Sequence, residues 1–228
     1  MIKVENIDIW GFEHAIRGMR NPMNSWAKSD SYQTHIENPE TLNTAPFQFV
    51  VGEKDLELMK TLFKAGPEHR KYLRQIMVSM DVLAPLYWWK EFDTYKVGTV
   101  ANSCSTMHKI AEKEFEIEDF SCEHLCSNGA IDNNRKSNNY DAYGCLLHII
   151  DVLNYFRESY LKHKTKTYWW QMIQLLPSSY NQKRTVTMTY ENVMTIIRQR
   201  TGHKLDEWNN FVDILKKLPY VEAIMGDD

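Results

Sequence analysis

The chain has 228 residues, which suits one large domain or two small ones. Apolar residues make up 43% and charged residues 25%, values typical of a globular protein with a sizeable core. The formal net charge of −3 argues against a general electrostatic affinity for nucleic acid, and no window approaches the roughly 18 apolar residues that a membrane span needs.

The first residues do not have the pattern of a secretory signal. MIKVENIDIWGFEHA carries Glu5, Asp8 and Glu13 and has no unbroken apolar core. We therefore expect a cytoplasmic protein with neither a membrane nor a nucleic-acid partner. In that compartment four cysteines are expected to be reduced: Cys104, Cys122, Cys126 and Cys145.

The N-terminal half predicts alternating strands and helices. Weak alternation predicts a strand over 3–10, and a short helix is predicted over 12–19. Residues 21–46 are rich in Asn, Ser, Thr and Pro and predict an irregular, anchored loop. An apolar stripe predicts a helix over 52–64, which a following Gly-Pro pair ends.

A central strand and helix are predicted around a proline. Apolar residues near period two favour a strand over 72–83. Ala84-Pro85 breaks this strand, and Pro85 suits the first turn of a helix over 86–93.

The next stretch is less regular. Residues 95–101 predict a loop or a short extended piece, and 105–115 predict a helix. Residues 112–141 are acidic and then Asn-rich, which predicts a mobile insertion around 127–141. There is no internal repeat and no Gly/Ser-rich linker, so we expect a single domain over 1–228.

The C-terminal half is predicted to be rich in helix. Helices are expected over 143–163, 168–176, 192–200 and 205–218, with a short strand over 185–189. The first of these helices is amphipathic. Its predicted buried side consists of Leu146, Leu147, Ile150, Leu153, Phe156 and Tyr160.

Arg200 falls on the apolar stripe of its predicted helix. Val193 and Ile197 share that stripe at helical spacing. Arginine keeps its charge in any environment, so an inward arginine needs a partner anion. The pattern leaves open whether this anion is a carboxylate of the protein or the phosphate of a ligand.

Several common chemistries lack their motifs. The cysteines, with His124 and His148, contain no CxxC pair, so we expect structural cysteines and no metal site. The patterns GxxxxGK[ST], GxGxxG and GxSxG are all absent. The aromatic runs 87–89 and 168–170 could stack a flat ligand, but filling a core between helices is the favoured interpretation.

Basic residues are spread along this nearly neutral chain. They either converge on one anionic pocket or represent scattered surface charge, and periodicity does not choose between the two. They are Arg17, Arg20, His69, Arg70, Lys71, Arg74, Lys90, Lys96, Lys183, Arg184, Arg198 and Arg200.

The order of these features resembles the flavin-dependent thymidylate synthases, the ThyX or thymidylate-synthase-complementing proteins. AIRGMR at 15–20 is similar to the family's N-terminal helix with paired arginines, and His69 stands where the family has a flavin-contacting histidine. APLY at 84–87 is similar to its strand-to-helix step. The C-terminal block is matched by Leu176-Pro177, Thr187, Met194 and Arg200.

The family's central signature, RHRxxSxNExSxR, is largely replaced. Thr94 and Tyr95 stand for the first arginine and the histidine, while Lys96 keeps a positive charge. The remaining positions, counted without gaps, carry Thr99, Ala101-Asn102, Cys104 and Thr106, and a shift of one or two places would align Ser103 or Ser105.

The resemblance implies an α+β, ThyX-like fold that is rich in helix and has a small mixed or antiparallel sheet. It also implies a homotetramer with active sites at subunit interfaces. The implied activity is that of a flavoprotein methyltransferase of nucleotide biosynthesis. FAD would be the cofactor, dUMP would be methylated to dTMP, and methylenetetrahydrofolate and NADPH would be co-substrates.

Site residues follow from the resemblance and the basic groups. The predicted cofactor-binding residues are His69, Lys96, Thr99 and Arg200. The predicted substrate-binding residues are Arg17, Arg20, Asn102, Ser105, Lys183, Arg184 and Arg200. No catalytic residue is assigned. The replaced signature favours an alternative, a non-catalytic protein of the same fold that binds a nucleotide or a protein partner.

Overall fold

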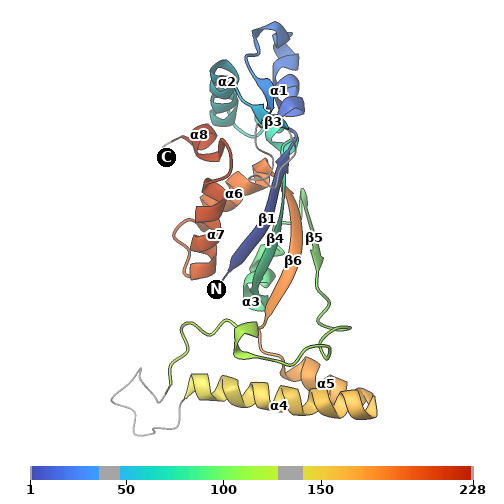
Figure 1. Ribbon diagram of the computed structural model, residues 1–228. Helices are drawn as coiled ribbons and strands as arrows, with labels where there is room; N and C mark the ends of the chain where they lie inside the picture. The colour runs from blue at the N-terminus through green and yellow to red at the C-terminus, as the bar shows by residue number, and fades with distance from the viewer. Residues whose placement is uncertain (1, 36–46, 128–140, 227–228) are drawn as a thin grey trace, which may run out of the picture. The chain divides into compact units, whose positions relative to one another are not determined.

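The computed structural model describes residues 2–35, 47–127 and 141–226 (Figure 1). The insertion predicted around 127–141 lies almost wholly outside the described residues, as does the later part of the loop predicted over 21–46. Among the described helices, none combines the length and apolar character that crossing a membrane requires.

The fold is α+β, as predicted. A four-stranded sheet has the order β1-β4-β6-β5, and a two-stranded antiparallel sheet pairs β2 with β3. The strands are β1 (Lys3–Trp10), β2 (Tyr32–His35), β3 (Phe47–Val50), β4 (Met77–Pro85), β5 (Thr99–Ser103) and β6 (Asn181–Thr189).

Most of the predicted helices are confirmed, with shifts of a few residues at their ends. The helix expected over 105–115 is absent. The structure also contains a helix, α8, that the sequence pattern did not predict. The α-helices are α1 (Phe12–Arg20), α2 (Glu53–Lys64), α3 (Leu86–Phe92), α4 (Ala142–His163), α5 (Lys166–Leu175), α6 (Tyr190–Arg200), α7 (Asp206–Lys216) and α8 (Val221–Met225).

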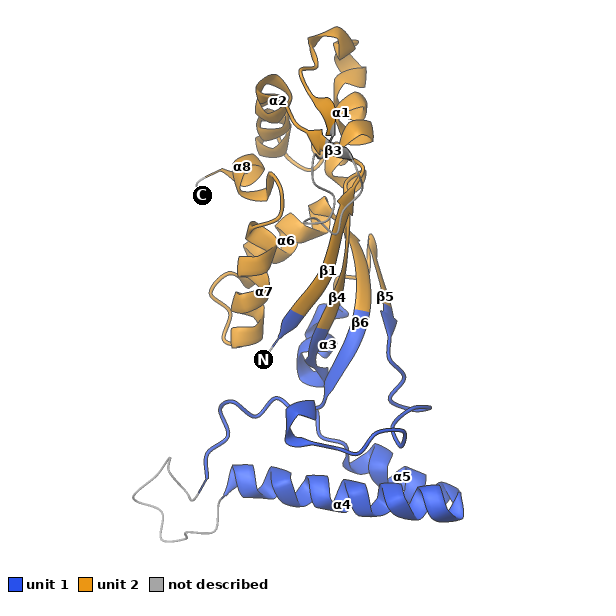
Figure 2. Ribbon diagram, in the orientation of Figure 1, with its two compact units in different colours: residues 1–3, 83–94, 102–184 blue, residues 4–82, 95–101, 185–228 orange. Residues whose placement is uncertain are grey.

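The chain divides into two compact units built from interleaved segments (Figure 2). Unit 1 contains residues 1–3, 83–94 and 102–184, and unit 2 contains 4–82, 95–101 and 185–228. Each strand of the four-stranded sheet has residues in both units. The single-domain organisation stays a prediction.

Alternate side chains of β4 and β6 form part of the core of unit 2. Val78, Met80 and Val82 of β4 are buried, and so are Val186 and Met188 of β6. The period-two pattern was therefore correct for β4. Its predicted start was wrong, because Lys71–Arg74 form a 3-10 turn whose Tyr72 and Leu73 also point inward.

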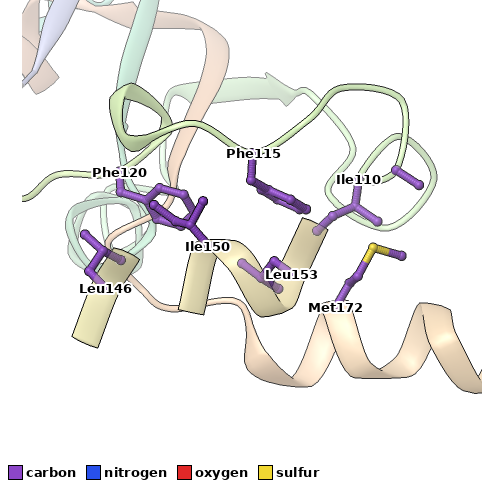
Figure 3. Packing of buried hydrophobic residues seen from close by; sticks show 8 residues of the cluster. Ile110, Phe115, Phe120, Leu146, Ile150, Leu153 and Met172 are labelled. Carbon is purple, nitrogen blue, oxygen red and sulfur yellow. The ribbon is translucent and has the colours of Figure 1, made fainter. Parts of the chain in front are cut away.

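The core of unit 1 lies between α4, α5 and residues 110–120 (Figure 3). Leu146, Ile150 and Leu153 of α4 pack there with Met172 of α5. These α4 residues confirm most of the predicted buried stripe. Leu147 was assigned wrongly, because 42% of it is exposed.

Residues 105–115 do not form the predicted helix. Their backbone is instead held by side chains of α4: Asn154 bonds both the N–H and the carbonyl of Phe115, at 2.8 and 2.9 Å, and the Nε of Arg157 donates to the Ala111 carbonyl at 3.1 Å. Ile110 and Phe115 are thereby buried without helical hydrogen bonds. Local apolar spacing was mistaken for helical periodicity.

The predicted loop over 21–46 contains the strand β2. Its four residues pair with β3, from Tyr32 opposite Val50 to His35 opposite Phe47. The aromatic run 87–89 supplies core residues, because Trp88 and Trp89 are fully buried. In the second run, 168–170, Trp170 is 42% exposed.

Candidate functional site

In unit 2, the segment that carries Lys96 and Thr99 lies along α6. The Nδ2 of Asn192 donates to the Val97 carbonyl at 2.6 Å and to the Thr99 hydroxyl at 2.7 Å. The N–H of Thr189 donates to the carbonyl of Gly98, whose φ of +73° favours glycine. Three predicted cofactor-binding residues, Lys96, Thr99 and Arg200, thus belong to one segment and the helix beside it.

The helix α6 presents Arg200 for a local reason. The Thr189 side chain caps the helix by accepting from the Asn192 N–H at 3.3 Å. Val193 and Ile197 are buried on the stripe that sequence analysis identified, and Arg200 lies three residues further along. The inward placement of Arg200 is consistent with its half-buried state.

Three side chains hold the guanidinium of Arg200 in place: Tyr95, His203 and Trp208. We call these three residues and Arg200 the Arg200 cluster. The Nε of Arg200 donates to the Tyr95 hydroxyl at 2.9 Å, and an Nη lies 3.2 Å from the Nε2 of His203. The guanidinium carbon is 4.4 Å from the ring centre of Trp208 and 5.6 Å from that of Tyr95. A guanidinium held in one orientation by aromatic faces is suited to bind an anionic group.

Sequence reasoning identified Arg200 but missed the rest of the cluster. The sequence pattern predicts a carboxylate or a phosphate as the partner of Arg200, whereas the structure places a phenol, an imidazole and an indole beside it. His203 and Trp208 flank the predicted start of the next helix, and Tyr95 lies 105 residues before Arg200 in the sequence. Their polar and aromatic character was a signal, but no spacing rule connects them.

The other end of α6 carries an ion-pair network. Glu191 pairs with Arg74 and, at 3.4 Å, with Arg70. Burial raises the pKa of Glu191, but hydrogen bonds and charge from Arg74 and Arg70 outweigh it, so the pKa lies below its ordinary value. The exposed His69 directly precedes this group, at the end of α6 opposite to Arg200. Since α6 has 11 residues, its two ends are about 15 Å apart.

The paired arginines predicted on α1 have different environments. Arg17 is exposed. Arg20 is only 5% exposed, and its Nε donates to the buried Asp55 carboxylate at 2.6 Å. An Nη of Arg20 also donates to the Ser25 carbonyl at 3.3 Å. Because Arg20 is enclosed and paired, we leave it out of the candidate site and assign it a structural role.

The other predicted substrate residues lie in unit 1 where β5 ends beside β6. The N–H of Cys104 donates to the Lys183 carbonyl at 2.9 Å, which brings Asn102 and Ser105 near the start of β6. Lys183 is exposed. Arg184 donates to Asp93 at 2.7 Å and lies over the Trp89 ring at 4.3 Å. Its anion is thus a protein carboxylate.

The cysteines are free thiols, and the described residues contain no group of three or more His, Cys, Asp or Glu side chains placed to hold a metal ion.

Together these features define an α+β protein with a small sheet and a set of cation-bearing helix ends. The same fold occurs in two crystal structures of the flavin-dependent thymidylate synthase ThyX from Helicobacter pylori, both with FAD and dUMP. One matches 98% of this chain and 97% of its own with a TM-score of 0.63, and the other matches 99% and 97% with 0.64. Sequence identity is 15% in both, so the likeness confirms the ThyX-like fold. No protein-family model and no curated protein matches the chain.

Proposed function

We propose that this chain is a cytoplasmic flavoprotein of the ThyX fold that binds FAD and a pyrimidine nucleotide similar to dUMP. The observation that carries the proposal is the fold match over nearly the whole chain to two ThyX structures complexed with those ligands. Fold does not fix function, so the residues themselves must also suit such ligands.

The Arg200 cluster has suitable chemistry. FAD and dUMP both carry phosphates, and the aromatic rings of the cluster orient a guanidinium that can pair with a phosphate. Lys96 is exposed and directly follows Tyr95, so it adds a second positive charge beside the cluster. We propose that Arg200 and Lys96 hold the phosphates of the cofactor or nucleotide, with the Thr99 hydroxyl and His69 as further contacts.

The finer activity that we propose is FAD-dependent methylation of dUMP to dTMP with methylenetetrahydrofolate and NADPH. Bound flavin supplies hydride chemistry, and the protein contributes binding, orientation and charge. Arg17, Asn102, Ser105 and Lys183 are the remaining candidates for nucleotide contacts. All four are polar, and all but the half-buried Ser105 are exposed.

A non-catalytic nucleotide-binding protein is the second candidate, and two observations favour it. Two arginines that sequence analysis assigned to substrate, Arg20 and Arg184, are paired with Asp55 and Asp93. At the signature position where the resembled family has a histidine, Tyr95 instead orients Arg200.

The absorbance spectrum of the purified protein tests the flavin proposal most directly. We expect the purified protein to show flavin absorbance bands. If it does not, we expect the bands after incubation with FAD and removal of unbound FAD by gel filtration. Retained FAD together with conversion of dUMP would favour the enzyme, whereas dUMP binding without conversion would favour the second candidate. A protein that retains no FAD and binds no dUMP contradicts both.

We expect Arg200→Ala to weaken FAD or dUMP binding by tenfold or more. The variant loses a charge-assisted contact worth about 1.5–3 kcal/mol. Arg198→Ala is the matched control, because Arg198 is exposed on the same helix and lies over Phe63 instead of in the cluster. Isothermal titration calorimetry would show the difference. Equal affinity in both variants would remove Arg200 from the binding site.

We also propose that the protein is a homotetramer, as its resemblance to the ThyX proteins implies. Analytical ultracentrifugation at micromolar concentration should then give about four times the 27.0 kDa mass of the chain. A single 27.0 kDa species would contradict this expectation.

A further inference from the structure

A cavity of about 430 Å³ opens inside unit 1 between α4, α5 and residues 107–111. It shares no residue with the Arg200 cluster. We propose that this cavity binds a second small ligand, a planar aromatic ring that carries an anionic group. Its volume lies within the range of about 300–1,000 Å³ that is usual for small-molecule sites.

The floor of the cavity is apolar and belongs to the core of the unit. Ile110 and Ala111 line it, and they are 5% and 8% exposed. Figure 3 shows Ile110 among the packed side chains that include Phe115, Leu153 and Met172. Such a floor offers apolar surface to a ring and no hydrogen-bond partner to a solvated group.

The walls of the cavity are aromatic, and a hydrogen bond fixes the orientation of one aromatic ring. Tyr160 and Trp169 both line the cavity. The indole Nε1 of Trp169 donates to the Met107 carbonyl at 3.0 Å. This bond satisfies the polar atom of the indole and holds its ring in place, while the ring itself lines the cavity. A flat ligand can therefore stack here.

The rim is positively charged. Lys164 and Lys166 line the cavity. They lie in the exposed sequence KHKTK at 162–166, which spans the end of α4 and the start of α5. Among the residues that the structure describes, neither lysine forms an ion pair with a carboxylate. Two ammonium groups beside aromatic walls match a ligand whose anionic group projects from its ring.

The backbone at Lys164 supports a role for its side chain. Lys164 ends α4 with a φ of +53°, and its N–H donates to the Tyr160 carbonyl at 2.7 Å. Helices that end in this left-handed conformation usually have glycine there. The chain instead carries a lysine whose Nζ lies 5.6 Å from the ring centre of Tyr160, at the cavity wall.

A nucleoside monophosphate and an aromatic carboxylate both have this chemistry. Isothermal titration of the full-length protein with AMP and with 1-naphthoate distinguishes the two sources, since the tighter ligand identifies the class. Adenosine and inorganic phosphate each supply half of the proposed interaction, so both should bind at least tenfold more weakly than AMP if AMP is the tighter ligand. If neither AMP nor 1-naphthoate binds, the proposal is wrong.

Paired variants locate the binding. The double variant Lys164→Ala/Lys166→Ala should lower the affinity for the tighter anion by about tenfold, whereas Lys162→Ala, in the same exposed sequence but outside the cavity, should not. Trp169→Leu should weaken binding by about tenfold through lost stacking. Its control is Trp26→Leu, which changes an exposed indole of unit 2.

Arg200→Ala separates this proposal from the flavin proposal. In this variant, which weakens the nucleotide site of the proposed function, AMP and 1-naphthoate should still bind through the cavity, even if the protein retains no flavin. Binding that is lost in Arg200→Ala but kept in the double lysine variant would place the ligand elsewhere and overturn the cavity assignment. A melting temperature close to that of the wild type would show that each variant is folded.

Discussion

Asp55→Ala is expected to lower the free energy of unfolding by about 3–5 kcal/mol, because it leaves the buried Arg20 guanidinium without its carboxylate. Asp55 is fully buried on α2 and accepts from Arg20 at 2.6 Å. Its other oxygen accepts from the hydroxyls of Ser29 and Ser31 at 2.6 and 2.7 Å and from two backbone N–H groups at 3.1 Å. One carboxylate thus joins α1, α2 and the segment before β2.

Urea denaturation measures this loss, and Glu57→Ala is the matched control. Glu57 lies on the same helix and forms an exposed pair with Lys60 at 3.8 Å. An exposed pair of this kind contributes only about 0–1 kcal/mol. A loss of less than 1 kcal/mol in Asp55→Ala would mean that the buried network does not stabilise the fold.

Stability should also depend on pH through Asp55. Burial raises the pKa of Asp55, but hydrogen bonds from Ser29, Ser31 and Arg20, together with the charge of Arg20, hold it below its ordinary value of 3.8. The unfolded chain therefore takes up the proton first as pH falls. The contribution to stability is present well above pH 3.8 and is lost as pH falls through the lowered value. Asp55→Ala should show a shallower loss of stability below about pH 5.

Trp208→Ala is expected to cost about 3–5 kcal/mol of stability and to loosen the Arg200 cluster. Trp208 is fully buried on α7 and packs edge to face against Phe211, with ring centres 6.1 Å apart. Its removal leaves a large cavity beneath the guanidinium, which lies 4.4 Å above the indole. Thermal and urea denaturation report the loss of stability.

Two further variants separate packing from ligand binding. Trp170→Ala should change stability by less than about 1 kcal/mol, because 42% of Trp170 is exposed. Trp208→Phe keeps an aromatic face under Arg200, so it should retain FAD or dUMP affinity better than Trp208→Ala does. A fully stable Trp208→Ala variant would contradict the assignment of this indole to the core.

Local patterns predicted the elements whose side chains follow a simple period. The stripe of Val193, Ile197 and Arg200 predicted both α6 and the inward arginine, and alternation predicted most of β4. The period failed over 105–115, because Asn154 and Arg157 satisfy that backbone from another part of the chain. It also missed β2, whose partner β3 lies beyond a polar stretch.

The sequence by itself determined the α+β class, the principal helices and the basic residues that any anion site would use. Only the tertiary structure decided which of those residues are already paired: Arg20 with Asp55, Arg184 with Asp93, and Arg70 and Arg74 with Glu191. It also brought Tyr95 and Trp208 to Arg200. The reason is physical. A helix or strand repeats over a few neighbouring residues and leaves a period in the sequence, whereas an ion pair between residues 117 positions apart, such as Arg74 and Glu191, leaves none.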